Sequence, residues 1–235
     1  MATATDTFLQ ELDALIQSKH LLNHAFYLAW SKGELSIDCL KEYAKEYYHH
    51  VQAFPTYLSA LHAHTEDAST RKVLLQNLIE EEAGSPNHPD LWRNFTTALG
   101  VTESELACHT PNAEISSLID AFRSICSKLG VAEGVAALYA YESQIPKICI
   151  SKIDGLKKHY GMQDPNSWQY FSVHIAADEQ HAAEERSLLQ SYITPKNMSD
   201  VRTSAHTVLE GLWNFLSGLC ERYNISCDCE VKVAN

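Results

Sequence analysis

The chain has 235 residues, of which 45% are hydrophobic, and this combination suits one sizeable hydrophobic core better than two small ones. Its formal charge of −12, from 30 acidic against 18 basic residues, disfavours a nucleic-acid partner, because phosphate binding requires clustered Lys and Arg. The sequence shows neither a basic segment followed by an apolar run nor a stretch apolar enough for membrane insertion, so we expect a soluble protein.

Apolar residues recur at intervals of three and four almost throughout, while alternating β-branched runs are scarce, so the pattern predicts an all-α protein. Thr102 followed by Glu105 is a capping-box signal for one short helix. In the first half of the chain we expect the other helices over about residues 6–30, from 37 with a kink at Pro55, over 67–83, and over 91–99.

The second half of the chain continues the helical pattern. We expect helices over about 112–129, over 131–160 with a kink at Pro146, from Asp164-Pro165 onward, and over about 199–223. The sequence therefore predicts one domain over residues 1–223, built as a bundle of about seven to nine helices. Residues 224–235 lose the periodicity and are predicted to form a flexible tail.

The seven cysteines are odd in number and scattered, which is unlike the disulfide framework of a small secreted domain. We expect reduced thiols. Cys227 and Cys229 are close enough to share a soft metal ion, but an unstructured chain end is the simpler interpretation.

One stretch of the chain has the spacing of metal ligands. His174, Asp178 and His181 are four and seven residues apart, so a helix would project all three from one stripe. Ferritin-like dimetal bundles use the same logic, with further carboxylates from facing helices. Glu184 and Glu185 follow, and Glu185 continues the stripe, but salt bridges with Arg186 or with lysines are the expected role of both.

Two further segments could complete such a site. Glu81, in an acidic run, lies seven residues before His88, although Gly84 and Pro86 require the pair to converge across a kink or turn. Glu142 lies in an apolar segment, where an ionised carboxylate is costly to bury without a partner or a metal ion.

Three carboxylates and three imidazoles form a ligand set that suits iron or manganese better than thiolate-bound zinc. Each half of the set, taken alone, is also typical of a solvated helix face or of a core histidine. The occurrence of all six on three separate predicted helices favours the metal site.

The sequence also resembles a known family, the heme-oxygenase-like dimetal oxidases, over nearly its full length. Within that family it is similar to the chlamydial death-domain-associating proteins, which are relatives of the pyrroloquinoline-quinone oxidases (PqqC). The segments that carry the resemblance are LAWSKGEL (28–35), AFPTYLSA (53–60), PNHPDLW (86–92) and VAEGVAALYAYESQIP (131–146).

The resemblance implies a heme-oxygenase-like (PqqC/TenA-like) helical bundle with a dinuclear metal centre of iron, or of iron plus manganese. Dioxygen and a reductant would be co-substrates. The ligand positions that it implies are Glu81, His88, Glu142, His174, Asp178 and His181.

The activity that the resemblance implies is the synthesis of para-aminobenzoate for folate biosynthesis, from a tyrosine of the protein itself. Tyr27 would be cleaved between its α and β carbons, Lys152 would donate the amino group, and Tyr43 and Tyr141 match catalytic positions. The residues alone do not select these four. Tyr27 and Tyr43 suit a helical core, and Lys152 suits a surface position with a partly buried stem.

Other functions remain open. The resemblance also implies a homodimer, and a host effector that binds death-domain receptors and modulates apoptosis is an alternative. We expect the bacterial cytoplasm as the location, with export into the host cell as the alternative. A thiaminase-like or PqqC-like enzyme acting on an external small molecule, and heme binding through His20 or His24, are further alternatives.

Overall fold

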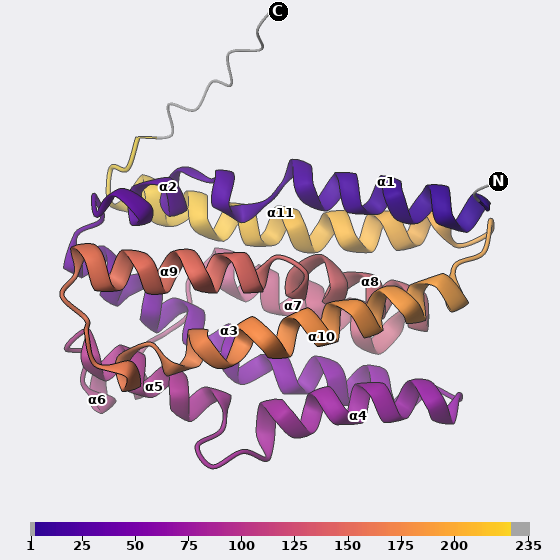
Figure 1. The fold of residues 1–235 in the computed structure, drawn as a ribbon, viewed down its shortest axis with the longest axis horizontal. Coiled ribbons are helices and arrows are strands. Elements are labelled where there is room, and N and C mark those ends of the chain that lie inside the picture. Colours follow the sequence, from indigo (N-terminus) through magenta and orange to yellow (C-terminus); the bar gives the residue numbers. More distant parts are fainter. Residues whose placement is uncertain (1–2, 227–235) are drawn as a thin grey trace, which may run out of the picture.

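The computed structural model describes residues 3–226, and the regular secondary structure of this part of the chain is entirely helical (Figure 1). The all-α prediction is confirmed. The α-helices are α1 (Ala4–Ser18), α2 (Ala25–Lys32), α3 (Ile37–His64), α4 (Ala68–Glu82), α5 (His88–Ala98), α6 (Glu103–Ala107), α7 (Ala113–Lys128), α8 (Val131–Glu142), α9 (Ile145–His159), α10 (Gln169–Tyr192) and α11 (Met198–Arg222), with short 3₁₀ turns η1 (Leu21–Asn23) and η2 (Pro165–Ser167).

The described part of the chain has eleven α-helices, more than the seven to nine expected, partly because the helix expected over residues 6–30 is divided. The His20 side chain accepts a hydrogen bond from the Leu22 N–H and caps η1, and the His24 side chain accepts one from the Phe26 N–H and caps α2. Each cap satisfies a backbone donor at the start of a new helix and so favours a new start over continuation.

The long helix expected over 131–160 is also two helices. Helix α8 ends at Glu142 and α9 begins at Ile145, so Pro146 lies in the first turn of α9, where the missing N–H group costs little. Helix α3, in contrast, continues through Pro55 to His64. The break after Glu142 makes this carboxylate the last residue of α8.

The core lies between the long helices. Helix α8 packs against α7, α10 and α11, while α3 packs against α4 and α7, and α10 also contacts α9. Figure 1 shows α1 and α11 side by side along one edge and α10 crossing the middle of the molecule. One cluster of buried hydrophobic residues extends from Phe8 to Cys220. The predicted limits of a single domain, residues 1–223, remain a prediction.

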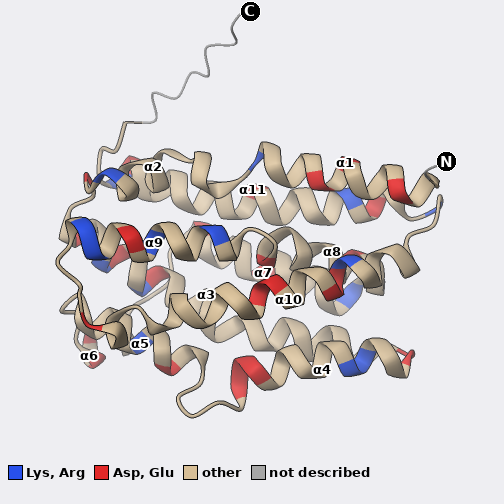
Figure 2. Cartoon of the chain, viewed as in Figure 1, with Lys and Arg blue, Asp and Glu red and all other residues tan. Residues whose placement is uncertain are grey.

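Charged residues are distributed over the outside of the bundle. Figure 2 shows Lys and Arg interspersed with Asp and Glu, with an acidic run at the end of α4. Within residues 3–226, no helix has the length and apolar character needed to cross a membrane, and the same residues contain no disulfide. Most of the predicted tail, including Cys227 and Cys229, lies outside the described residues.

Candidate metal centre

Helix α10 presents His174, Asp178 and His181 on one buried face, as their spacing predicts. The Nδ1–H of His174 donates to the carbonyl oxygen of Tyr170 at 2.6 Å. Because this bond fixes the tautomer, the Nε2 atom of His174 is free to act as a metal ligand.

Glu81 and His88 converge across the turn between α4 and α5. Glu81 lies in the last turn of α4 and His88 is the first residue of α5, capped by Asn87. The Nδ1 atom of His88 lies 2.8 Å from Oε2 of Glu81, and Nε2 of His174 lies 3.8 Å from Oε1 of Glu81.

Glu142, at the end of α8, is only 1% exposed. Its Oε1 atom accepts a hydrogen bond from Nδ2 of Asn77 at 2.9 Å and lies 3.2 Å from Nδ1 of His181. Asn77 lies on α4, so α4, α8 and α10 all meet at this carboxylate.

The six predicted ligands form two adjoining groups, Glu81–His88–His174 and Glu142–Asp178–His181, and in each group the potential ligand atoms lie within 4.8 Å of one another. A cavity of about 10 Å³, close to the size of one water molecule, lies between the groups. Its lining residues are Val51, Phe54, Glu81, Tyr141, Glu142, Tyr170, His174 and Asp178.

Two buried carboxylate oxygens of the centre, Oε2 of Glu142 and Oδ2 of Asp178, lack a hydrogen-bond partner within residues 3–226. Unpartnered buried polar atoms are costly, and a divalent metal ion would satisfy them. The donors are oxygen and nitrogen atoms, a set that iron and manganese accept. The residues therefore fit a pair of such ions.

The electrostatics of the centre reflect crowded carboxylates. Burial, and then the neighbouring Glu142 carboxylate, raise the pKa of Asp178 well above its usual range. Burial acts to lower the pKa of His181, but contacts with Asp178 and Glu142 raise it to about 11. Burial, and then the neighbouring His88, lower the pKa of His174. Such shifts are typical of a site built for a charged ligand.

One acidic residue that lies beside the centre was not expected there from the sequence. Glu185 was expected to form surface salt bridges, but it is only 3% exposed, and Arg186 pairs with Asp13 at 2.8 Å instead. Glu184 accepts a hydrogen bond from Gln180 on the outer face of α10. The position of Glu185 on the ligand stripe was the available signal.

A second polar group lies deeper in the core, where Tyr27 on α2, Tyr43 on α3 and Lys152 on α9 meet. The amine Nζ of Lys152 lies 2.6 Å from the Tyr43 hydroxyl and 5.5 Å from the centre of the Tyr27 ring. The Tyr43 hydroxyl in turn lies 3.4 Å from the Tyr27 hydroxyl. Lys152 is only 4% exposed, so its interpretation as a surface lysine is wrong. Burial lowers its pKa to about 8.

Aromatic side chains connect the lysine group with the metal centre. The ring of Tyr43 stacks on that of Tyr47 at 5.5 Å, and the Tyr47 hydroxyl lies 2.7 Å from that of Tyr141, which lines the small cavity. Tyr47 was not among the predicted site residues. Its position follows from the packing of α3 against its neighbours, which the sequence does not show.

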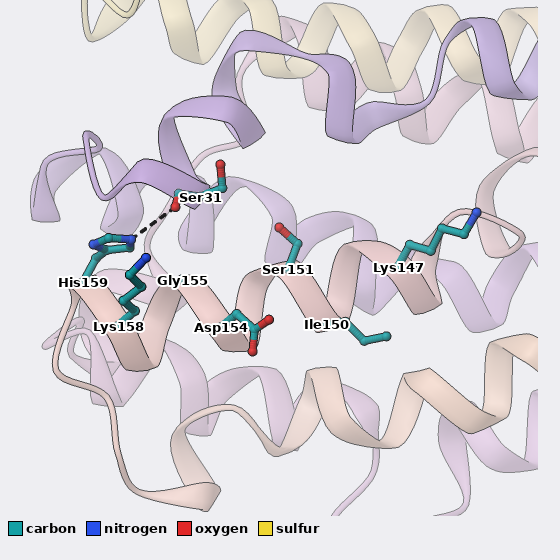
Figure 3. Close-up of a pocket in the computed structure, with 8 residues that line it drawn as sticks. All are labelled: Ser31, Lys147, Ile150, Ser151, Asp154, Gly155, Lys158 and His159. Carbon is teal, nitrogen blue, oxygen red and sulfur yellow. Dashed lines mark hydrogen bonds between the residues drawn. The ribbon is translucent and has the colours of Figure 1, made fainter.

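The open pocket of about 540 Å³ in Figure 3 lies elsewhere, on the outer side of α9. It is lined by Ser31, Lys147, Ile150, Ser151, Asp154, Gly155, Lys158 and His159, none of which was a predicted site residue.

His20 and His24, the candidates for heme binding, both serve as helix caps, and His24 also contacts Ser217.

The structure combines an all-helical bundle with a buried set of oxygen and nitrogen donors that suits metal ions. The bundle matches a Shewanella denitrificans structure described as a domain of unknown function with a heme oxygenase-like fold, with a TM-score of 0.78, 15% identity, and coverage of 92% of this chain and 91% of that one. Residues 41–213 match the model of a family described as "Iron-containing redox enzyme", and the chain belongs to that family.

Two relatives are similar over nearly the whole chain. One is a 4-aminobenzoate synthase of Chlamydia pneumoniae, 44% identical over 95% of this chain and 99% of the relative. The other is a 4-aminobenzoate synthase of Nitrosomonas europaea, 43% identical over 98% of both chains.

Proposed function

We propose that this chain makes 4-aminobenzoate from its own Tyr27, with Lys152 as the source of the amino group. The burial of the Lys152 amine among aromatic rings, with Tyr27 at 5.5 Å, carries the proposal. The rings of Tyr43 and Phe171 lie as near, so the choice of Tyr27 among them comes from the sequence resemblance. The activity itself is suggested by relatives at 43–45% identity that cover nearly the whole chain.

The chemistry of the two ends of the ring supports this assignment. Tyrosine carries a methylene carbon and a hydroxyl in para positions, and the product carries a carboxyl and an amine in the same positions. Breaking the bond between the α and β carbons of Tyr27 and oxidising the β carbon gives the carboxyl group. The Lys152 nitrogen would then replace the phenol oxygen, which leaves as water. The bond between this nitrogen and the Cε carbon of Lys152 would break, with dioxygen as the oxidant, so that the amine stays on the ring.

The neighbouring residues prepare the amine. With a pKa near 8, a fraction of about one tenth of the Lys152 side chains is neutral and nucleophilic at pH 7. The Tyr43 hydroxyl, 2.6 Å away, positions the nitrogen and can exchange a proton with it. Burial of Tyr27 and Tyr43 excludes bulk water from the reacting groups.

The six ligands would hold an iron pair or an iron–manganese pair. When bound, this pair supplies, with dioxygen and a reductant, the oxidising power that the reaction needs. The buried tyrosines Tyr141, Tyr47 and Tyr43 lie between the ligands and Tyr27.

The size of the cavity at the centre favours an internal substrate. A volume of about 10 Å³ has no room for an organic molecule, so an oxidase of an external substrate would have to repack this part of the core. Homodimer formation and binding to host death domains remain predictions from the sequence resemblance.

The variant Tyr27→Phe tests the proposal. We expect it to fold and to bind metal as the unchanged protein does, but to form no 4-aminobenzoate, because the ring oxygen that the amine displaces is missing. The measurement is product formation after reconstitution with iron and manganese under reductant and dioxygen. Tyr139→Phe, which removes a hydroxyl that bonds to Asp13 away from the centre, is the control. Normal product from Tyr27→Phe would overturn the proposal.

A further inference from the structure

We infer that Glu185 is a seventh protein ligand of the metal centre, on the ion held by Glu142, Asp178 and His181. This inference rests on the proposed function only in assuming that two metal ions are bound. It assigns to Glu185 a role that neither the sequence pattern nor the six-ligand set includes.

The position of Glu185 on α10 directs its carboxyl group toward the centre. It lies one helical turn beyond His181 and two turns beyond Asp178, on the same stripe. Its carboxyl group contacts that of Glu142 and interacts electrostatically with Asp178. Three helical positions that approach one point are already ligands, and Glu185 is the fourth acidic or imidazole side chain in that row.

No N–H or O–H group within residues 3–226 donates to either carboxyl oxygen of Glu185, although the residue is only 3% exposed, and its carboxyl group contacts that of Glu142. A buried carboxyl group without a donor costs several kcal/mol. Oε2 of Glu142, beside it, lacks a partner as well. A cation between them would satisfy both carboxylates.

The charge of the centre supports the same conclusion. The ligand carboxylates of Glu81, Glu142 and Asp178 carry three negative charges when ionised, and the imidazoles that bind metal are neutral. Glu185 brings the total to four, which equals the charge of two divalent ions. Buried charges that are balanced in this way avoid the penalty of an unpaired ion.

Titration of the metal-free protein with Mn²⁺ alone tests the inference, with calorimetry and electron paramagnetic resonance as readouts. We expect Glu185→Gln to weaken binding of one of the two ions at least tenfold. Glu179→Gln, which changes an exposed glutamate of the same helix, should keep both affinities within about twofold of the original.

The stability of the same variants gives a second readout. If Glu185 is a ligand, Glu185→Gln should melt at a higher temperature than the original without metal, and should gain less on addition of Mn²⁺. If Glu185 only shares a hydrogen bond with Glu142, Glu185→Gln should leave the Mn²⁺ affinity and the Mn²⁺-induced rise in melting temperature unchanged. That result would overturn the inference. Should Glu185→Gln not fold, Glu185→Ala is titrated in its place, with the same expectation.

The two proposals fail in different ways. The protein could bind two Mn²⁺ ions tightly, with one affinity dependent on Glu185, and yet form no 4-aminobenzoate. That result would support the assignment of Glu185 as a ligand and contradict the proposed function. If the protein forms product and Glu185→Gln binds Mn²⁺ with unchanged affinity, the assignment of Glu185 as a ligand is contradicted and the proposed function is not.

Discussion

The amine of Lys152 shows how strongly a core can change one residue. Burial lowers its pKa from 10.5 to about 8, so the folded chain holds this proton less tightly than the unfolded chain does. Below pH 8 both states are protonated, and the folded state carries the full cost of the buried charge. Between pH 8 and 10.5 the folded state loses the proton first, so the free energy of unfolding rises with pH.

We therefore expect the unfolding free energy of the protein, relative to that of Lys152→Met, to increase by about 2 kcal/mol between pH 7 and pH 9.5. The measurement is urea denaturation of both metal-free proteins at the two pH values. Lys147→Met, which changes an exposed lysine of the same helix and keeps Lys152, is the matched control and should follow the pH profile of the original protein. Parallel pH profiles for Lys152→Met and the original would contradict the assigned burial.

At the level of residues, helical spacing predicts the clustering of the buried carboxylates and histidines better than it predicts the lysine group. Helical spacing brought His174, Asp178 and His181 together because one helix carries all three. Lys152 and Tyr27 come from helices far apart in the sequence, so their contact depends on packing that periodicity does not describe. Glu185 was misinterpreted because its neighbour Arg186 offered a plausible surface partner.

At the scale of the helices, α9 packs tightly against α2 at Gly155. A β carbon at this position would lie 2.6 Å from Cδ1 of the Trp30 ring and 3.2 Å from the Trp30 carbonyl oxygen. The Trp30 indole N–H also donates to the backbone carbonyl of Lys152 at 3.2 Å. The absence of a side chain at Gly155 thus permits the contact that places Tyr27 beside Lys152.

The substitution Gly155→Ala is expected to lower the unfolding free energy by about 1–3 kcal/mol, because a tightly packed interface must separate. The same separation should reduce the yield of 4-aminobenzoate. Asp154→Ala, on the exposed side of the same helix, is the matched control. Urea denaturation and product assays on both variants check the prediction. Equal unfolding free energies and equal product yields for Gly155→Ala and Asp154→Ala would contradict it.

The positions of helix breaks were harder to predict than the helices. The stretch over residues 6–30 contains neither Gly nor Pro, and its division depends on two histidine caps that periodicity does not reveal. Pro146 indicated a disturbance near its true place, but the break itself precedes it at Ser143 and Gln144. The all-α class survives these errors because apolar periodicity determines which face of each helix is buried.

For the whole molecule, ions bound at the candidate metal centre would couple stability to metal binding. Carboxylates from α4, α8 and α10 repel one another when the ions are absent, and bound ions would hold these helices together. A ligand at 100 times its dissociation constant stabilises the folded state by about 2.7 kcal/mol per site.

Mn²⁺ at that excess should therefore raise the melting temperature by about 5 to 10 °C per site for a chain of this length. Differential scanning calorimetry with and without Mn²⁺ measures the shift, and a chelator should reverse it. Glu81→Ala, which removes a ligand from one ion, should show a smaller shift. An equal shift in this variant would exclude Glu81 from the site.

The most direct test of the self-sacrificing reaction is intact-protein and peptide mass spectrometry after one reaction with iron, manganese, reductant and dioxygen, with 4-aminobenzoate assayed in the same samples. The proposed function predicts no more than about one product molecule per chain, and a matching loss of mass in the peptide that contains Tyr27. Product formed while Tyr27 remains intact would contradict it.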